Sequence, residues 1–321
     1  MNMIVDERAR IATSNVVGWY ERATVRTRPR IMVPASAQSE DIYPRSRQAL
    51  ATHPTIMGLG EEAVRYILNQ STYKYMYEIG LLETRFVIDC ALKIINRAIY
   101  PGASDEERLD AITIVIDEGY HAHVALDFII QMKAVSAVEP LSVPSTNRNL
   151  DAVRRTAAKL PERMQDTFEL VAVCLAEHTL TKDLLSIGKE RDTTLAFTQV
   201  MTDHVADEGR HAGYFSRLLS AYWLTLDDET KTAIGTLLPA HLDDYLAGDD
   251  DRLFDRQVMA AVGLDANQIE TVLKDTDQSY FASVNSYIGT TKANLVNLLK
   301  RMGMLNHPAT RAAFLARGLV E

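Results

Sequence analysis

Two stretches of the chain share the pattern Asp-Glu-Gly-x-His-Ala, DEGYHAH at 117–123 and DEGRHAG at 207–213. In each stretch a glutamate precedes a histidine by three residues, and the surrounding segment is rich in Ala, Val, Leu and Ile. On an α-helix, residues three or four apart project from the same face. A charge left unpaired on an apolar face costs several kcal/mol, so such side chains must reach water or share a counter-ion. Two such pairs on two helices indicate a shared cation.

The two pairs are Glu118 with His121 and Glu208 with His211. His204 precedes Glu208 by one helical turn and lies on the same predicted face. A dimetal site inside a four-helix bundle also takes one glutamate from each of the two remaining helices. The motifs therefore predict two further glutamates on two other helices.

Glu177 is one of these candidates, because its predicted helix face is otherwise apolar. On the first long helix we prefer Glu83 to Glu78, since Glu78 shares its face with Lys74 and Arg85 whereas the face of Glu83 is apolar. The predicted ligands are Glu83, Glu118, His121, Glu177, His204, Glu208 and His211. Carboxylate and imidazole donors without cysteine suit iron or manganese better than structural zinc.

An aspartate stands directly before the glutamate of each motif, Asp117 in the first and Asp207 in the second. Such a carboxylate can accept the second ring N–H of a ligating histidine and fix the orientation of its ring. In a bundle, the aspartate of one motif can serve the histidine of the other, so we expect both aspartates to support the ligands. His123 is expected to point about 140° away from Glu118, toward the surface or an interface.

The spacing of apolar residues predicts an all-α protein. A bundle over about 60–224 is expected from four long helices, at 60–99, 104–136, 161–187 and 190–224. An N-terminal arm, 1–59, with additional short helices lies before the bundle, and additional C-terminal helices occupy 226–321. These shorter helices are expected at 228–247, 251–262, 266–273 and 277–302. The whole chain, 1–321, is predicted to form a single domain around the bundle.

The composition argues against several classes of protein. The chain has 321 residues, of which 47% are hydrophobic and 24% charged, and a net charge of −9. An anionic chain without a run of Lys or Arg is not typical of nucleic-acid-binding or anionic-membrane-binding proteins. No apolar run reaches the length of a membrane span, and the N-terminus lacks the apolar core of a signal peptide. Cys90 and Cys174 lack metal-site spacing and offer at most one disulfide, so we expect a cytoplasmic protein.

Over about residues 60–215 the chain resembles the diiron N-oxygenases related to p-aminobenzoate N-oxygenase, a branch of the ferritin-like superfamily. The motif pattern of that branch is Glu, Asp-Glu-x-x-His, a lone Glu, and then His-x-x-x-Asp-Glu-x-x-His. Here Glu83 precedes DEGYH, Glu177 follows it, and HVADEGRH completes the pattern. The additional histidine, His204, distinguishes this branch from ferritins and ribonucleotide-reductase-like proteins.

The resemblance implies a ferritin-like fold and a site for two iron ions, with O₂ as co-substrate. It also implies oxidation of an amine nitrogen to a hydroxylamine, with nitroso or nitro products as further stages, in secondary-metabolite biosynthesis. A homodimer is implied as well. Manganese remains an alternative metal on ligand type. Since the sequence has no G-x-G-x-x-G motif for a flavin or nicotinamide, an external electron donor is expected.

The substrate stays open between an aryl amine, an aliphatic amine and an amino acid bound to a carrier protein. A carboxylated substrate would need a cation, and Arg85 and Arg210 are both expected to point away from the ligands. A cationic anchor could still come from the N-terminal arm or from 226–321. Two other functions remain as alternatives: another ferritin-like diiron oxidase or hydroxylase, and a non-enzymatic iron-binding protein.

Overall fold

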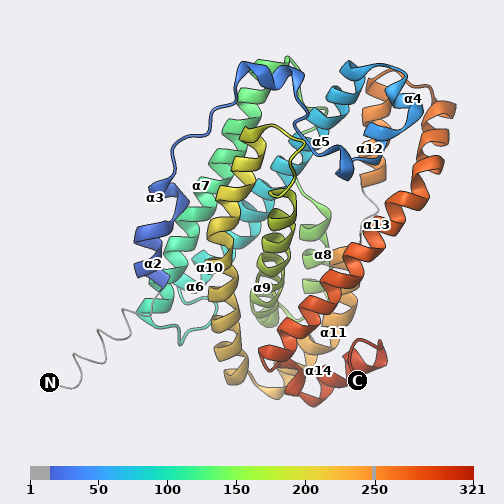
Figure 1. Ribbon diagram of the computed structural model, residues 1–321. Coiled ribbons are helices and arrows are strands. Elements are labelled where there is room, and N and C mark those ends of the chain that lie inside the picture. The colour runs from blue at the N-terminus through green and yellow to red at the C-terminus, as the bar shows by residue number, and fades with distance from the viewer. Residues whose placement is uncertain (1–14, 248–250) are drawn as a thin grey trace.

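The computed structural model in Figure 1 describes residues 15–247 and 251–321, which form helices, turns and loops without a strand. The all-α prediction is confirmed. The α-helices are α2 (Asn15–Arg22), α3 (Thr24–Thr27), α4 (Pro54–Met57), α5 (Glu61–Leu82), α6 (Ile88–Ile95), α7 (Asp105–Ser136), α8 (Arg148–Ala157), α9 (Glu162–Ile187), α10 (Leu195–Thr225), α11 (Asp228–Leu246), α12 (Asp251–Ala261), α13 (Ala266–Arg301) and α14 (Pro308–Ala316). Residues 1–14 of the predicted arm and residues 248–250 lie outside this description. Among the described helices, none is long and apolar enough to cross a membrane.

Four long helical segments run side by side at the centre of the molecule, as Figure 1 shows: α5 continuing into α6, then α7, α9 and α10. They match the four predicted bundle helices. α9 packs against α10, and α7 packs against α5 and α6. The short helices α2 and α3 lie against α7 and α10, while α8, α11 and α13 pack against α9. The predicted additional N- and C-terminal helices are therefore present around the bundle.

The start of α7 shows how local sequence fixes a bundle helix. The Ser104 side chain accepts a hydrogen bond from the Glu107 backbone N–H at 3.1 Å, and the Glu107 carboxylate accepts one from the Ser104 backbone N–H at 2.7 Å. This capping box satisfies two backbone donors that a helix start leaves free. Asp105 and Glu106 add negative charge at the positive end of the helix dipole. The register of α7, and with it the direction of its motif, is set from this end.

The first bundle helix contains an irregularity that the sequence pattern does not predict. Between α5 and α6, residues Glu83–Val87 form a π-helical segment. The hydroxyl of Thr84 donates to the Gly80 carbonyl at 2.6 Å within this stretch. Such single π turns amount to one extra residue in an α-helix and are frequent at functional sites. The segment begins at Glu83, one of the predicted ligands.

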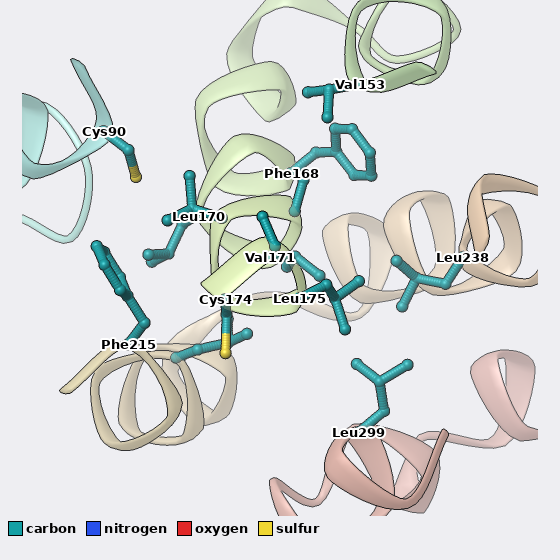
Figure 2. Close-up of a cluster of buried hydrophobic side chains, with 14 of the residues drawn as sticks. Cys90, Val153, Phe168, Leu170, Val171, Cys174, Leu175, Phe215, Leu238 and Leu299 are labelled. Carbon is teal, nitrogen blue, oxygen red and sulfur yellow. The ribbon is translucent and has the colours of Figure 1, made fainter. Parts of the chain in front are cut away.

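Helix α9 is buried on nearly every side. Figure 2 shows its side chains reaching toward α6, α8, α10, α11 and α13, with Phe168, Leu170, Val171, Cys174 and Leu175 among those labelled. These side chains belong to one of two apolar cores. A second core lies around Tyr73, Phe128 and Phe197. On each bundle helix, the predicted metal ligands fall between residues of the first core and residues of the second.

Two helix boundaries differ from those predicted. α10 begins at Leu195 rather than near 190, because the Thr194 hydroxyl accepts from the Phe197 backbone N–H at 3.2 Å and caps the helix there. The predicted segments 266–273 and 277–302 are one helix, α13. The Thr276 hydroxyl donates to the Val272 carbonyl at 2.7 Å, so this residue satisfies itself inside the helix and does not end it.

Two helices were missed. α8 follows a proline-rich stretch and is capped by Asn147, whose side chain accepts from the Leu150 backbone N–H at 2.9 Å. α14 lies in the predicted C-terminal tail and has Pro308 in its first turn, a position that proline favours. Cys90 and Cys174 are both buried free thiols, so neither forms the disulfide that the sequence left open.

His241 on α11 is a buried histidine outside the motifs. Its ring lies 5.0 Å from Phe168 and 5.6 Å from Tyr245, and its Nδ1 is 3.1 Å from the Thr156 hydroxyl. Burial lowers the pKa of this imidazole from 6.5 to about 4. The folded protein therefore keeps it neutral at pH values where the unfolded chain takes up a proton.

This difference predicts a pH-dependent loss of stability. As the pH falls from 7.5 to 5.5, His241 becomes protonated in the unfolded state but stays neutral in the folded state. This difference lowers the free energy of unfolding by about 1 kcal/mol. His241→Asn keeps a polar atom near Thr156 and removes the titration. Urea denaturation of both metal-free proteins at the two pH values should show the smaller loss in the variant. An equal loss of unfolding free energy in both proteins would contradict the lowered pKa of His241.

Candidate metal centre

The seven predicted ligands come together in one buried layer at the middle of the bundle. Their donor atoms form two groups, and within each group all donor atoms lie within 4.8 Å of one another. The first group is Glu83, Glu118, His121 and His204, and the second is Glu118, Glu177, Glu208 and His211. Each of the seven residues is at least 94% buried, because none exceeds 6% exposure. Glu118 is common to both groups.

Glu208 also lies between the two groups. Its Oε1 is 2.9 Å from His204 Nε2, 3.5 Å from His121 Nδ1 and 3.6 Å from His211 Nδ1. Glu83 Oε1 lies 3.0 Å from His204 Nε2, and Glu118 Oε1 lies 2.8 Å from His211 Nδ1. The seven side chains therefore converge on a common centre from four helical segments.

The donor atoms fit metal cations better than they fit one another. Both carboxylate oxygens of Glu83, Glu177 and Glu208 are buried without a well-formed hydrogen bond. The same holds for Nε2 of His204 and Nδ1 of His211. Buried polar atoms are nearly always paired, and each unpaired one costs free energy. Two cations at the centre of the two groups would satisfy these atoms.

The ionisation of the cluster points the same way. Burial raises the pKa of Glu83 to about 7. Burial also raises the pKa of Glu177 well above its usual value, and the neighbouring carboxylates Glu208 and Glu118 add to the effect. Burial opposes protonation of His121 and His211, yet the surrounding carboxylates raise the pKa of both imidazoles. The buried carboxylates therefore favour taking up positive charge, as protons or as bound cations.

Each aspartate of the motifs contacts the histidine of the other motif. Asp207 Oδ2 lies 3.2 Å from His121 Nε2, and Asp117 Oδ2 lies 3.1 Å from His211 Nε2. When each aspartate accepts the Nε2–H, the Nδ1 atom of each histidine faces the carboxylate layer with its lone pair. This is the crosswise arrangement expected from the sequence. His123 is exposed, also as expected.

Arg210 does not point away from the site, so that expectation was wrong. Its guanidinium lies 3.1 Å from Asp117 Oδ2 and is also hydrogen-bonded to Asp207 Oδ1. The separation of Asp207 and Arg210 by three residues, which puts them on one helix face, was the available signal. Trp19 and Thr24, which sequence reasoning also missed, contact the same aspartates. No local pattern could have indicated these two residues, because they reach the site from the N-terminal segment.

Glu78 lies away from the cluster. It forms an ion pair with Lys74 at 2.9 Å and lines a separate polar cavity with Arg47 and Tyr75. Its side chain is 32% exposed, whereas Glu83 is fully buried. The geometry therefore brings Glu83, and not Glu78, to the carboxylate layer.

A small apolar cavity of about 20 Å³ borders the cluster on the side of His121 and His204. Its other walls include Ile31, Met76, Ile79, Tyr120, Val124, Val200, Met201 and Asp203. A larger outer cavity of about 240 Å³ shares four of the same residues, Ile31, Tyr120, Val124 and Val200. The shared walls make the two cavities neighbours between α7, α10 and the segment after α3.

Two arginines line the outer cavity, and both come from the N-terminal arm. Arg28 lies 3.3 Å from Asp203, and Arg30 contacts both carboxylate oxygens of Asp127 at 2.8 and 2.7 Å. Their side chains are 50% and 62% exposed. The arm thus supplies cations near the site, as the sequence left open.

The profile of the family described as "P-aminobenzoate N-oxygenase AurF" matches residues 32–303. The match extends beyond the motif region, 60–215, into the C-terminal helices. A search among curated proteins found no match. With a family match over most of the chain and buried Glu and His clusters consistent with a diiron site, this chain belongs to the AurF p-aminobenzoate N-oxygenase family of ferritin-like diiron N-oxygenases.

Proposed function

We propose that this enzyme uses O₂ to oxidise the nitrogen of a primary amine to a hydroxylamine, with nitroso and nitro products as further stages. The observation that carries the proposal is the buried cluster of carboxylate and imidazole donors beside an apolar cavity. One amine, one O₂, two electrons and two protons give one hydroxylamine and one water. The electrons come from an external donor. The setting we propose is secondary-metabolite biosynthesis.

The proposed ligands are the seven predicted residues, which form two groups of donors with Glu118 in common. Iron is the proposed metal, and manganese is the alternative that carboxylate and imidazole donors also accept. When bound, the two metals supply the activation of O₂ and the oxidising power. Four glutamates match the charge of two divalent cations, and the histidines add donors without adding charge. The site is therefore neutral when both metals are divalent.

The residues around the inner cavity exclude water and orient the amine. Ile79, Val124 and Met201 give this cavity apolar walls. Asp203 also lines it, and the Oδ2 atom of Asp203 is buried without a hydrogen-bond partner. That oxygen is suited to accept a hydrogen bond from the amine N–H and so to direct the nitrogen lone pair toward the metals.

The outer cavity suits the body of the substrate. About 240 Å³ accommodates a small ring or chain, and Tyr120 and Val124 give it apolar walls. Arg28 and Arg30 stand at its edge, where an anionic group of the substrate would replace or extend their pairs with Asp203 and Asp127. A carboxylated aryl amine fits this arrangement, and an aliphatic amine or a carrier-bound amino acid would use the same path.

The homodimer that the family resemblance implies is also proposed. The outer face of α7 carries Leu109, Ile112, Ile116, Leu126 and Ile130, all of them exposed. Their helical spacing places them on one face of α7, on either side of the exposed Gly119 and His123, and a second copy could cover this face. Size-exclusion chromatography would distinguish a dimer from the cage that an iron-storage protein forms.

The function is tested by exposing the iron(II)-loaded enzyme to O₂ with a panel of aryl, aliphatic and carrier-bound amines. Mass spectrometry should detect a product heavier by one oxygen atom. His204→Ala should fold and keep part of its iron. Its product yield should fall more than about 10–100-fold, which is the loss typical for a residue that only supports a ligand. Glu78→Ala is the control, because Glu78 lies away from the cluster and lines neither the inner nor the outer cavity. Wild-type product yield from His204→Ala would contradict the N-oxygenase assignment.

The ligand set is tested on the first bundle helix. Glu83→Ala removes a carboxylate from the buried layer and should lower the metal content below two ions per folded chain. Glu78→Ala breaks the pair with Lys74, which lies away from the buried layer, and should retain both ions. Metal analysis of anaerobically reconstituted protein distinguishes the two. If Glu78→Ala lost metal and Glu83→Ala retained both ions, Glu78 would be the ligand instead of Glu83.

The substrate path is tested at Ile31, which lines both cavities. Ile31→Trp should fill the passage between them and lower kcat/KM for the best amine by about tenfold, or about 1.4 kcal/mol of transition-state stabilisation, without loss of metal. Met32→Trp adds the same side chain at a neighbouring position that is 61% exposed and should leave kcat/KM unchanged. Unchanged kcat/KM in Ile31→Trp would show that amines enter elsewhere.

A further inference from the structure

The two motif histidines are held alike by their aspartates, but the aspartates themselves are held differently. Asp117, which contacts His211, accepts the indole N–H of Trp19 at 2.7 Å through its other oxygen. Asp207, which contacts His121, accepts the backbone N–H of Thr24 at 3.2 Å and a short hydrogen bond from the Thr24 hydroxyl.

Both outer donors come from one short piece of chain. Trp19 is on α2 and Thr24 is the first residue of α3, and the fully buried Ala23 lies between the two helices. Trp19 is 7% exposed and Thr24 is 1% exposed. Because these contacts are shielded from water, the two donors restrain the carboxylates more strongly than exposed groups would.

Arg210 joins the two aspartates. It donates to Asp117 Oδ2 at 3.1 and 3.2 Å and to Asp207 Oδ1. A planar guanidinium can serve two carboxylates at once in fixed directions, whereas a lysine ammonium is a single point charge on a flexible chain. Its side chain is 13% exposed, so its charge acts on the aspartates with little screening.

We propose that Trp19, Thr24 and Arg210 are positioning residues, each acting on the metal ligands through an aspartate. Trp19 orients His211 and so governs the group formed by Glu118, Glu177, Glu208 and His211. Thr24 orients His121 and so governs the group formed by Glu83, Glu118, His121 and His204. Arg210 governs both. This inference rests on the proposed metal centre.

The physical reason lies in how a carboxylate rotates. Trp19 fixes Asp117 at Oδ1. The Thr24 hydroxyl instead binds Asp207 at Oδ2, the oxygen that also contacts His121, and Arg210 holds Asp207 Oδ1. With such a donor in place, each aspartate keeps its Oδ2 directed at the histidine Nε2–H, and the ring presents Nδ1 to the centre. Without that donor, the carboxylate turns to find another partner and the ring loses its fixed orientation. Loss of such a supporting residue typically costs about 10–100-fold in metal affinity.

The test is an anaerobic titration of the metal-free protein with Co(II), followed by visible absorption and calorimetry. The wild type should bind two equivalents. His211→Ala should abolish binding of one of the two Co(II) ions. Trp19→Phe should weaken the binding of that same ion by about tenfold or more. His121→Ala should abolish binding of the other Co(II) ion. Thr24→Val keeps the backbone N–H, so it should weaken the binding of that ion by a smaller factor. Arg210→Gln should weaken both, and Arg210→Lys should restore part of the loss.

Matched controls separate positioning from general stability. Tyr20→Phe and Thr27→Val make comparable changes on α2 and α3 at residues that contact neither aspartate, and both should bind Co(II) like the wild type. The proposal is overturned if Trp19→Phe and Thr24→Val weaken both equivalents to the same extent, or weaken neither. A wild-type protein that binds fewer than two equivalents would instead refute the metal centre itself.

Discussion

Seven ionisable side chains lie between two apolar cores with almost no access to water. Removing charges from water costs several kcal/mol for each ion unless partners compensate. This constraint explains why every bundle helix carries a polar residue at one level and apolar residues above and below it. It also explains why the carboxylates converge, because four of them can be buried together only around positive charge. The bundle is thus organised around a charged layer whose burial the apolar cores alone could not compensate.

The same requirement extends outward through the aspartates to the N-terminal segment. Burial would raise the pKa of Asp207, but hydrogen bonds from His121 and Thr24 and the charge of Arg210 keep it well below its usual value. The aspartate therefore stays ionised beside a buried histidine. A segment that lies far from the motifs in sequence thereby becomes part of their environment. Its fold and the order of the centre depend on each other.

Much of this arrangement follows from the sequence. The repeated Asp-Glu-x-x-His motif and the helical period put Glu118 and His121 on one face, and burial follows from the apolar neighbours. The choice of Glu83 over Glu78 followed from the same comparison of faces, although the π turn that begins at Glu83 left no trace in the pattern. The helix start at Ser104 was readable because a capping box is local. The continuity of α13 could not be predicted. A polar stretch such as Lys274–Thr276 has the same composition whether it ends a helix or forms an exposed turn within one.

The contacts between the N-terminal segment and the motifs could not be predicted. Trp19 meets Asp117 across a separation of 98 residues, and Thr24 meets Asp207 across 183. A single sequence contains no periodicity that relates such positions. Arg210 is a different case: its pairing with Asp207 is local, but its position two residues from Glu208 predicted a side chain that points away from the ligands. Long side chains on the flank of a buried face reach back over it when a carboxylate lies there.

The step from an outer cavity of about 240 Å³ to an inner one of about 20 Å³ has a consequence for molecular shape. An unsubstituted –NH₂ group is close in size to a water molecule, which needs about 10–15 Å³ of such space. An N-alkyl group adds a carbon at the point where the walls are narrowest, and the packed side chains around it yield only at a cost in strain. In the proposed reaction the degree of substitution at nitrogen is therefore selected by steric exclusion, while the rest of the molecule is free to vary in the wider space behind it.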